Sequence, residues 1–81
     1  MFEEKEALRK KMSNRFRSTR MRLDITQERM AELLAIDPRS YSDLERGKNL
    51  CSTQVFLRYL RLGDTDISEL LEDLGTILNR N

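Results

Sequence analysis

The chain lacks histidine and tryptophan, and it contains one cysteine, Cys51, and one proline, Pro38. These gaps remove the ligands of a Cys/His zinc site, the cysteine pairs of a disulfide framework, and any Ser-His or Cys-His catalytic pair. We therefore expect no metal, no cofactor and no enzymatic activity. Three glycines and one proline are also too few for the many tight turns of an all-β fold.

Long apolar runs are absent as well. No stretch approaches the roughly 18 apolar residues that would indicate a membrane span, and the segment Met1–Glu4 is unlike the start of a signal peptide. A lone cysteine without an export signal is typical of a reducing compartment. We therefore expect a cytoplasmic protein without a membrane partner, and the 81 residues suffice for one small domain, 1–81.

Charge is unevenly distributed, although the net charge is only +1. Residues 7–22 hold seven basic side chains and no acidic one, whereas residues 63–81 hold five acidic side chains and one arginine. This separation predicts one surface for a polyanion and a different role for the C-terminal segment. The alternative, from charge alone, is a solvated helix face whose charges only keep the protein soluble.

Apolar periodicity indicates a helix over about residues 4–22, because this segment carries one narrow apolar stripe. Arg20 lies at the edge of the stripe, and Asp24 interrupts the pattern. The stripe consists of Leu8, Met12, Phe16, Thr19 and Leu23.

Two short helices follow, separated by a short turn. Thr26 is a suitable N-cap for the first, and Asp37 with Pro38 begins the second. Gly47 is expected to end the second helix. The spacing predicts a helix-turn-helix unit over about residues 26–46.

A fourth helix is predicted to begin at Ser52 or Thr53 and to end at Gly63. A fifth is expected over about residues 67–78, with Asp66 as its N-cap. The fold class is therefore all-α, a compact five-helix bundle.

The fifth helix carries more apolar side chains than a domain of this size can readily cover, which indicates an interface. We expect it to pair two copies of the chain in a homodimer; the alternative is that it only completes the core of one copy. Gly75 lies inside this helix and either ends it early or lets another helix approach closely. The expected interface residues are Ile67, Leu70, Leu71, Leu74 and Leu78, together with Ile77.

The segment from Thr26 to Lys48 resembles the Cro/CI-like (XRE) helix-turn-helix family. That family has a Thr-Gln start, a Leu/Met-Ala pair in its second helix and a Glu-x-Gly-Lys exit from its third. The resemblance covers about residues 15–63 and implies a lambda repressor-like bundle that binds double-stranded DNA. The matching residues here are Thr26-Gln27, Met30-Ala31 and Glu45-Arg46-Gly47-Lys48.

The resemblance also implies roles for single residues. Arg20 and Glu45 match a buried ion pair between the first and third helices. Gln27 matches a glutamine that binds a DNA phosphate at a helix N-terminus, where free N–H groups favour an anion. The outward face of the third helix is expected to read bases in the major groove. The base-reading candidates are Arg39, Ser42 and Asp43, and the phosphate-binding candidates are Gln27, Arg46, Lys48 and Asn49.

Three positions depart from the family pattern. Ala35 replaces a glycine that is common in the turn, and Pro38 occupies a position that often carries a polar base reader. Asp43 places an acid on a face that must approach phosphates, where it either accepts a hydrogen bond from cytosine or repels the DNA.

Two functions remain open at this point. One is a sequence-specific DNA-binding transcriptional regulator, a small homodimeric repressor or antitoxin-type regulator with no small-molecule ligand. The other is a protein-interaction module of the same fold, which would use Asp43 and the acidic C-terminal segment to bind a partner protein.

Overall fold

The structure, a computed structural model, describes residues 2–63 and 66–78. Five helices run through this part of the chain, and none of its residues forms a strand, so the predicted all-α fold is confirmed. No helix in the described ranges is long and apolar enough to cross a membrane. The helices are α1 (Phe2–Leu23), α2 (Gln27–Leu34), α3 (Pro38–Glu45), α4 (Thr53–Leu60) and α5 (Ile67–Leu78).

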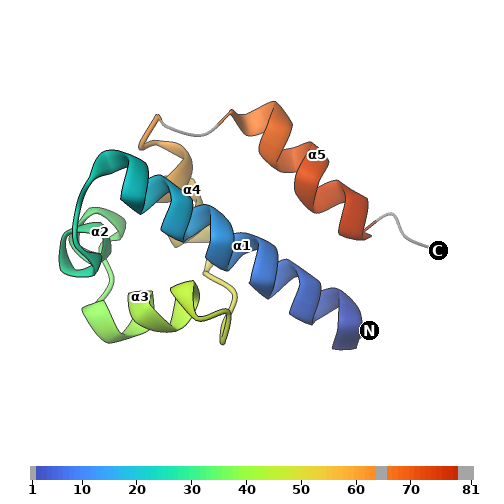
Figure 1. Cartoon of the computed structure of the whole chain (residues 1–81), viewed down its shortest axis with the longest axis horizontal. Helices are drawn as coiled ribbons and strands as arrows, with labels where there is room; N and C mark the ends of the chain where they lie inside the picture. Colours follow the sequence, from blue (N-terminus) through green and yellow to red (C-terminus); the bar gives the residue numbers. More distant parts are fainter. Residues whose placement is uncertain (1, 64–65, 79–81) are drawn as a thin grey trace.

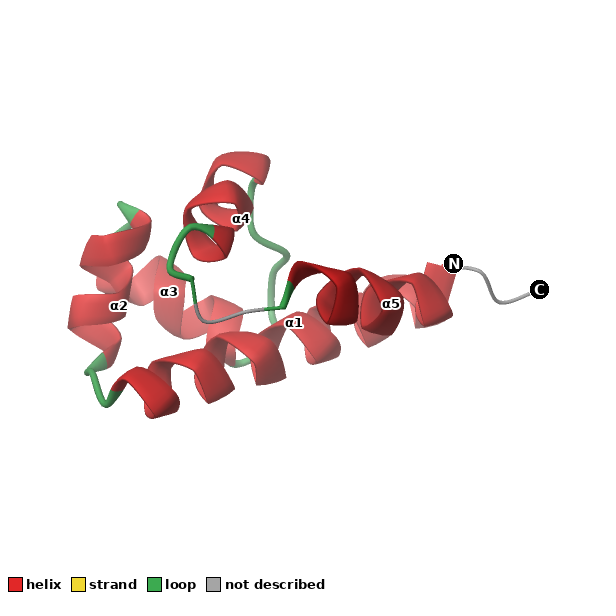
Figure 2. Ribbon diagram, turned by 90° about the horizontal axis from the view of Figure 1, so that it is seen from above, coloured by secondary structure: helices red, strands yellow, loops and turns green. Residues whose placement is uncertain are grey.

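The long helix α1 is the element on which the others are assembled. It packs against α3 and against α5, and α2 packs against both α3 and α4. Figure 1 shows α1 between α3 and α5, and Figure 2 shows α5 lying along the N-terminal half of α1. The helix-turn-helix formed by α2 and α3 is therefore held on one side of α1, and α5 on another.

The core is centred on three aromatic rings. Phe16 meets Tyr59 edge to face at 4.9 Å and Tyr41 at 6.1 Å, which is a favourable geometry for aromatic pairs. The hydroxyl of Tyr59 lies 2.9 Å from that of Thr19, so each of these buried hydroxyl groups has a hydrogen-bonding partner. Leu23, expected on the same stripe of α1, is exposed because it is the last residue of the helix and lies beyond the core.

Local capping explains where the helices of the helix-turn-helix begin. The Thr26 hydroxyl accepts the N–H of Arg29 at 3.0 Å, and an Asp37 carboxylate oxygen accepts the N–H of Ser40 at 2.9 Å. The Ser40 hydroxyl donates to the other Asp37 oxygen at 2.7 Å. Both hydrogen bonds lower the pKa of Asp37, and the one from the Ser40 backbone N–H has the larger effect. Pro38 occupies the first turn of α3, where its missing N–H costs nothing.

The turn between α2 and α3 keeps the left-handed conformation that usually requires glycine. Ala35 has φ 59° and ψ 42°, and its N–H donates to the Glu32 carbonyl at 3.1 Å. The end of α2 therefore has the usual left-handed cap, although the Cβ of an alanine is crowded in that conformation.

The helix α5 is partly a core element. Leu70 is fully buried, Ile77 is nearly so, and Leu74 packs half-buried against the same core. The prediction that Leu70 lies at a dimer interface is therefore wrong, because the chain's own core already covers it. Gly75 does not end the helix, which continues to Leu78.

Ion pairs join the basic first helix to the acidic last one. The ammonium of Lys11 lies 3.1 Å from one carboxylate oxygen of Asp73, and the guanidinium of Arg15 lies 3.1 Å from the other. Arg15 also lies 3.5 Å from Glu69. The hydrogen bond from Lys11, followed by that from Arg15, lowers the pKa of Asp73. The two charged segments, expected to have separate roles, therefore neutralise each other in part.

Replacing Ala35 with glycine is expected to raise the free energy of unfolding by about 1 kcal/mol, because glycine adopts a positive φ without crowding. The matched control is Ala7→Gly inside α1, which should lower the free energy of unfolding by about 1 kcal/mol. Urea unfolding followed by circular dichroism measures both. A loss of stability in both variants would show that Ala35 is not strained.

Candidate nucleic-acid interface

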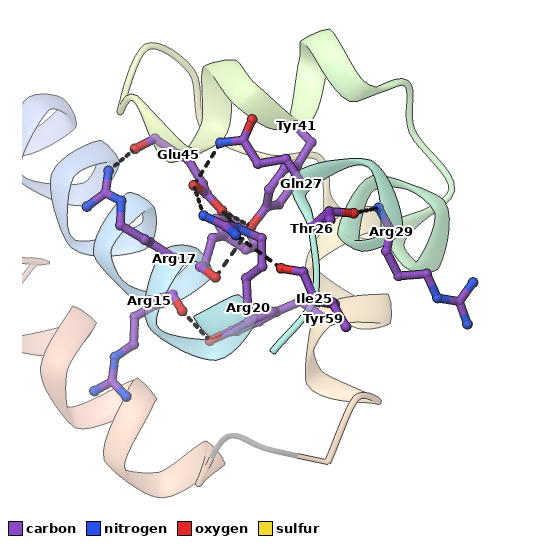
Figure 3. A network of polar contacts seen from close by, with 11 residues as sticks. Arg15, Arg17, Arg20, Ile25, Thr26, Gln27, Arg29, Tyr41, Glu45 and Tyr59 are labelled. Atoms are coloured by element: carbon purple, nitrogen blue, oxygen red, sulfur yellow. Dashed lines mark hydrogen bonds and ion pairs between the residues drawn. The ribbon is translucent and has the colours of Figure 1, made fainter. Parts of the chain in front are cut away.

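The buried carboxylate of Glu45, the last residue of α3, is the centre of a polar network that joins three helices (Figure 3). It accepts hydrogen bonds from Arg20 of α1 at 2.6 and 3.2 Å and from the Gln27 side-chain amide of α2 at 3.0 Å. The hydroxyl of Tyr41, one turn earlier on α3, also donates to it. We call these four residues the Glu45 network.

The network keeps its members in defined charge states. Burial alone would raise the pKa of the Glu45 carboxyl, but the hydrogen bonds from Arg20, Tyr41 and Gln27 bring it below its ordinary value. The hydrogen bond to Glu45 raises the pKa of Arg20. Burial and then the hydrogen bond to Glu45 raise the pKa of Tyr41. At neutral pH the network therefore contains one anion, one cation and a neutral phenol.

Further contacts tie the same group to the backbone. Arg20 donates to the Ile25 carbonyl at 3.1 Å, just before α2 begins. Arg17 donates to the backbone carbonyl of Glu45 at the C-terminal end of α3, where helix carbonyls have no partner within the helix. Both ends of the helix-turn-helix are therefore fixed to α1 by arginine side chains.

The structure brings Arg20 and Glu45 together as the family resemblance implied. Tyr41 and Arg17 also belong to this assembly, and neither was expected there. Tyr41 and Glu45 are four residues apart on one helix, which was a usable signal. Arg17 lies 28 residues before its acceptor, and no local pattern indicated that contact.

The side of α3 opposite the network carries the base-reading candidates. Arg39, Asp43 and Arg46 recur at helical spacing and therefore follow one side of the helix. Arg39 and Arg46 are exposed, whereas Asp43 and the neighbouring Ser42 are partly exposed. The inward residues of α3 are Tyr41, Leu44 and Glu45, all at most 5% exposed.

The phosphate-binding candidates lie at two places. Gln27 begins α2 and gives one N–H of its amide to Glu45, which leaves the second N–H of that group for another acceptor. Lys48 and Asn49 are exposed in the loop after α3. Lys48 borders a hollow shared with Arg46 and α1, whereas Asn49 borders a separate hollow of about 490 Å³ that includes Ser40 of α3.

Cys51 lies at the edge of the core, where burial raises the pKa of its thiol. A protonated thiol is a poor nucleophile and a poor metal ligand. Among the described residues, no group of three His, Cys, Asp or Glu side chains is placed to hold a metal ion. Cys51 is therefore a small packing residue.

Replacing Glu45 with glutamine is expected to lower the free energy of unfolding by about 3 kcal/mol at neutral pH, because Arg20 loses its carboxylate. Since the pKa of Glu45 is lowered in the folded protein, wild type loses this advantage as the pH falls through that pKa. The difference in the free energy of unfolding between the two proteins should therefore narrow as the pH falls below the ordinary pKa of a glutamate, about 4.3. Asp73→Asn, at a more exposed pair, is the control and should cost about 1 kcal/mol or less. A difference that stays constant with pH would contradict the charged state assigned to Glu45.

A family profile described as a helix-turn-helix domain matches residues 11–74, from the middle of α1 into α5. That family is found in Cro/CI-like (XRE) regulators. Comparisons with curated proteins and with solved structures found no match. The matched range includes the Glu45 network, the capped turn and the outward face of α3. The chain belongs to the helix-turn-helix domain family.

Proposed function

We propose that the protein is a sequence-specific DNA-binding transcriptional regulator, a small repressor or antitoxin-type regulator of the cytoplasm that reads the major groove with α3. The observation that best supports this proposal is the outward face of α3. Its polar side chains are exposed or partly exposed, while the Glu45 network fixes the opposite face to α1 and α2. Side chains on a helix held in this way approach a groove as one rigid set.

The chemistry of the face suits base recognition followed by backbone contact. Arg39 lies in the first turn of α3, where its planar guanidinium can donate to both O6 and N7 of a guanine. Asp43, one turn later, can accept from the exocyclic amine of a cytosine. The remaining candidates, Gln27, Arg46, Lys48 and Asn49, contact phosphates and set the register on the duplex.

The alternative, a protein-interaction module, would use Asp43 and the acidic C-terminal segment to bind a partner protein. Glu69 and Asp73 of that segment lie against Lys11 and Arg15 of the same chain. The charge of Asp73 is therefore engaged within the molecule, which makes part of this segment less available to a partner protein and favours the DNA-binding function.

Arg39→Ala should lower affinity for the preferred duplex by about 1–3 kcal/mol and leave affinity for random duplex almost unchanged. The preferred duplex is first selected from random sequences with the wild-type protein. Arg61→Ala removes the same charge from the exposed C-terminal end of α4 and serves as the control. An equal loss on both duplexes would make Arg39 a backbone contact, and absence of duplex binding by the wild type would refute the proposed function.

We further infer that two copies pair through α5. Its outward side carries Ile67, Leu71 and Leu78, which are 50%, 58% and 53% exposed. With the half-buried Leu74 they recur at alternating spacings of four and three, the pattern of a helix-pairing seam. Such pairing would place two copies of α3 on a two-fold DNA site, whose half-sites lie about 34 Å apart.

Leu71→Asp is expected to give a folded monomer that has lost tight binding to the two-fold site, because Leu71 belongs to the seam and not to the core. Leu57→Asp is the control, since Leu57 is 55% exposed on α4. Sedimentation gives the mass and circular dichroism the helix content. A wild type that sediments as a monomer at micromolar concentrations would contradict pairing through α5.

A further inference from the structure

An open groove of about 600 Å³ lies between α1 and the loop that follows α3, beside the face already described. Its rim is strongly basic. The α1 side contributes Arg9, Lys10 and Arg17, and the other side contributes Arg46 and Lys48. We call this the cationic groove.

We propose that the cationic groove holds phosphates of the DNA backbone, so that duplex binding extends from α3 onto α1. This inference rests on the proposed DNA-binding function and adds a second contact surface to it. Phosphate is the anion indicated, because the groove offers several separated cations instead of one enclosed pocket.

The basic run of α1 is divided between two faces, and only one of them is neutralised. Lys11 and Arg15 are engaged by acids of α5, at distances of 3.1 Å to Asp73. Arg9 and Lys10 form no ion pair with any residue in the described ranges. Neighbouring lysines of one helix, Lys10 and Lys11, therefore have opposite surroundings.

The acids that border the groove do not cancel this charge. Glu6 is the one exposed carboxylate on its rim within the described part of the chain. Glu45 also borders the groove, but its side chain is only 4% exposed and is paired with Arg20. Five cations thus face one exposed carboxylate.

The fold holds these cations in place through neutral contacts. Arg17 donates to the Asn14 side-chain carbonyl at 3.3 Å and to the Glu45 backbone carbonyl, so it is positioned without losing its positive charge. Gly47 has φ 73°, and a Cβ there would lie 3.6 Å from the Ser13 hydroxyl. The loop therefore lies close against α1, and the basic side chains line the two sides of the groove.

The groove continues directly from the outward face of α3. Arg46 belongs to both surfaces, because it follows the end of α3 and also borders the groove. The helical rise from Lys10 to Arg17 is about 10 Å. That length corresponds to about three steps from phosphate to phosphate along one strand, measured on the duplex axis. A backbone strand that passes the C-terminal end of α3 can thus meet all three α1 cations.

The test compares two double variants of the full chain that remove the same charge from opposite faces of α1. Arg9→Gln with Lys10→Gln removes the groove cations, and Lys11→Gln with Arg15→Gln removes the cations paired to α5. Single variants Lys10→Gln and Lys11→Gln repeat the comparison at adjacent positions, and circular dichroism verifies that each protein is folded. Affinity for the selected duplex and for random duplex is measured across a salt series.

The groove variant is expected to reduce the slope of log affinity against log salt by about two, since each lost phosphate contact removes about 0.9. At low salt its affinity should fall roughly tenfold or more on both duplexes, because phosphate contacts carry no sequence information. The control variant should keep the wild-type slope. This result would support the groove as a phosphate site.

Other outcomes separate failure of this inference from failure of the proposed function. An unchanged slope in the groove variant overturns the inference while duplex binding by the wild type stands. Equal losses in both double variants also overturn it, since they would reflect net charge only. If the groove variant lost affinity for a single-stranded RNA probe but kept its affinity for both duplexes, the groove would be a site for another polyanion, and the inference would be overturned. Absence of duplex binding by the wild type would refute both the groove inference and the proposed DNA-binding function.

Discussion

The position of the third helix depends on one buried carboxylate. Glu45 is ionised in a site that solvent hardly reaches, and an ion in such a site requires partners with good geometry. Arg20, Gln27 and Tyr41 supply them from α1, α2 and α3. Tyr41 moves with α3, but Arg20 and Gln27 belong to other helices, so a shift of α3 would pull the carboxylate away from both. This single charge therefore helps to set the orientation of the helix and of its outward face.

What the sequence made predictable was mostly local. Thr26, Asp37 and Ser52 each accept an N–H from three residues later, and such caps are visible in a short stretch of sequence. The exposure of Leu23 and the burial of Leu70 were not predictable in this way, because both depend on where α1 and α5 meet the core. The candidate site likewise has a part that was predictable from the sequence and a part that was not. Its residue types followed from a sequence motif, whereas the contact made by Arg17 required the packed fold.

The helix α5 combines two apolar surfaces that its sequence does not separate. Leu70 and Ile77 face the core, and Leu71 faces outward one residue after Leu70. Asp73 holds the helix against α1 through Lys11 and Arg15. With α5 docked in this way, the residues of the proposed seam, Ile67, Leu71 and Leu78, remain exposed. The core and the proposed dimer seam are thus set by one docking geometry.

The same ion pairs determine how a nearly neutral protein attracts a polyanion. A net charge of +1 predicts little attraction, but binding depends on the local field at the contact surface. Acids of α5 neutralise one face of α1, while the other face keeps its cations beside the end of α3. The acids of α5 that pair with α1 therefore leave the cations of the groove unneutralised. The groove joins cations of α1 to cations of the loop after α3, which lie far apart in the sequence, and this is why composition alone could not locate it.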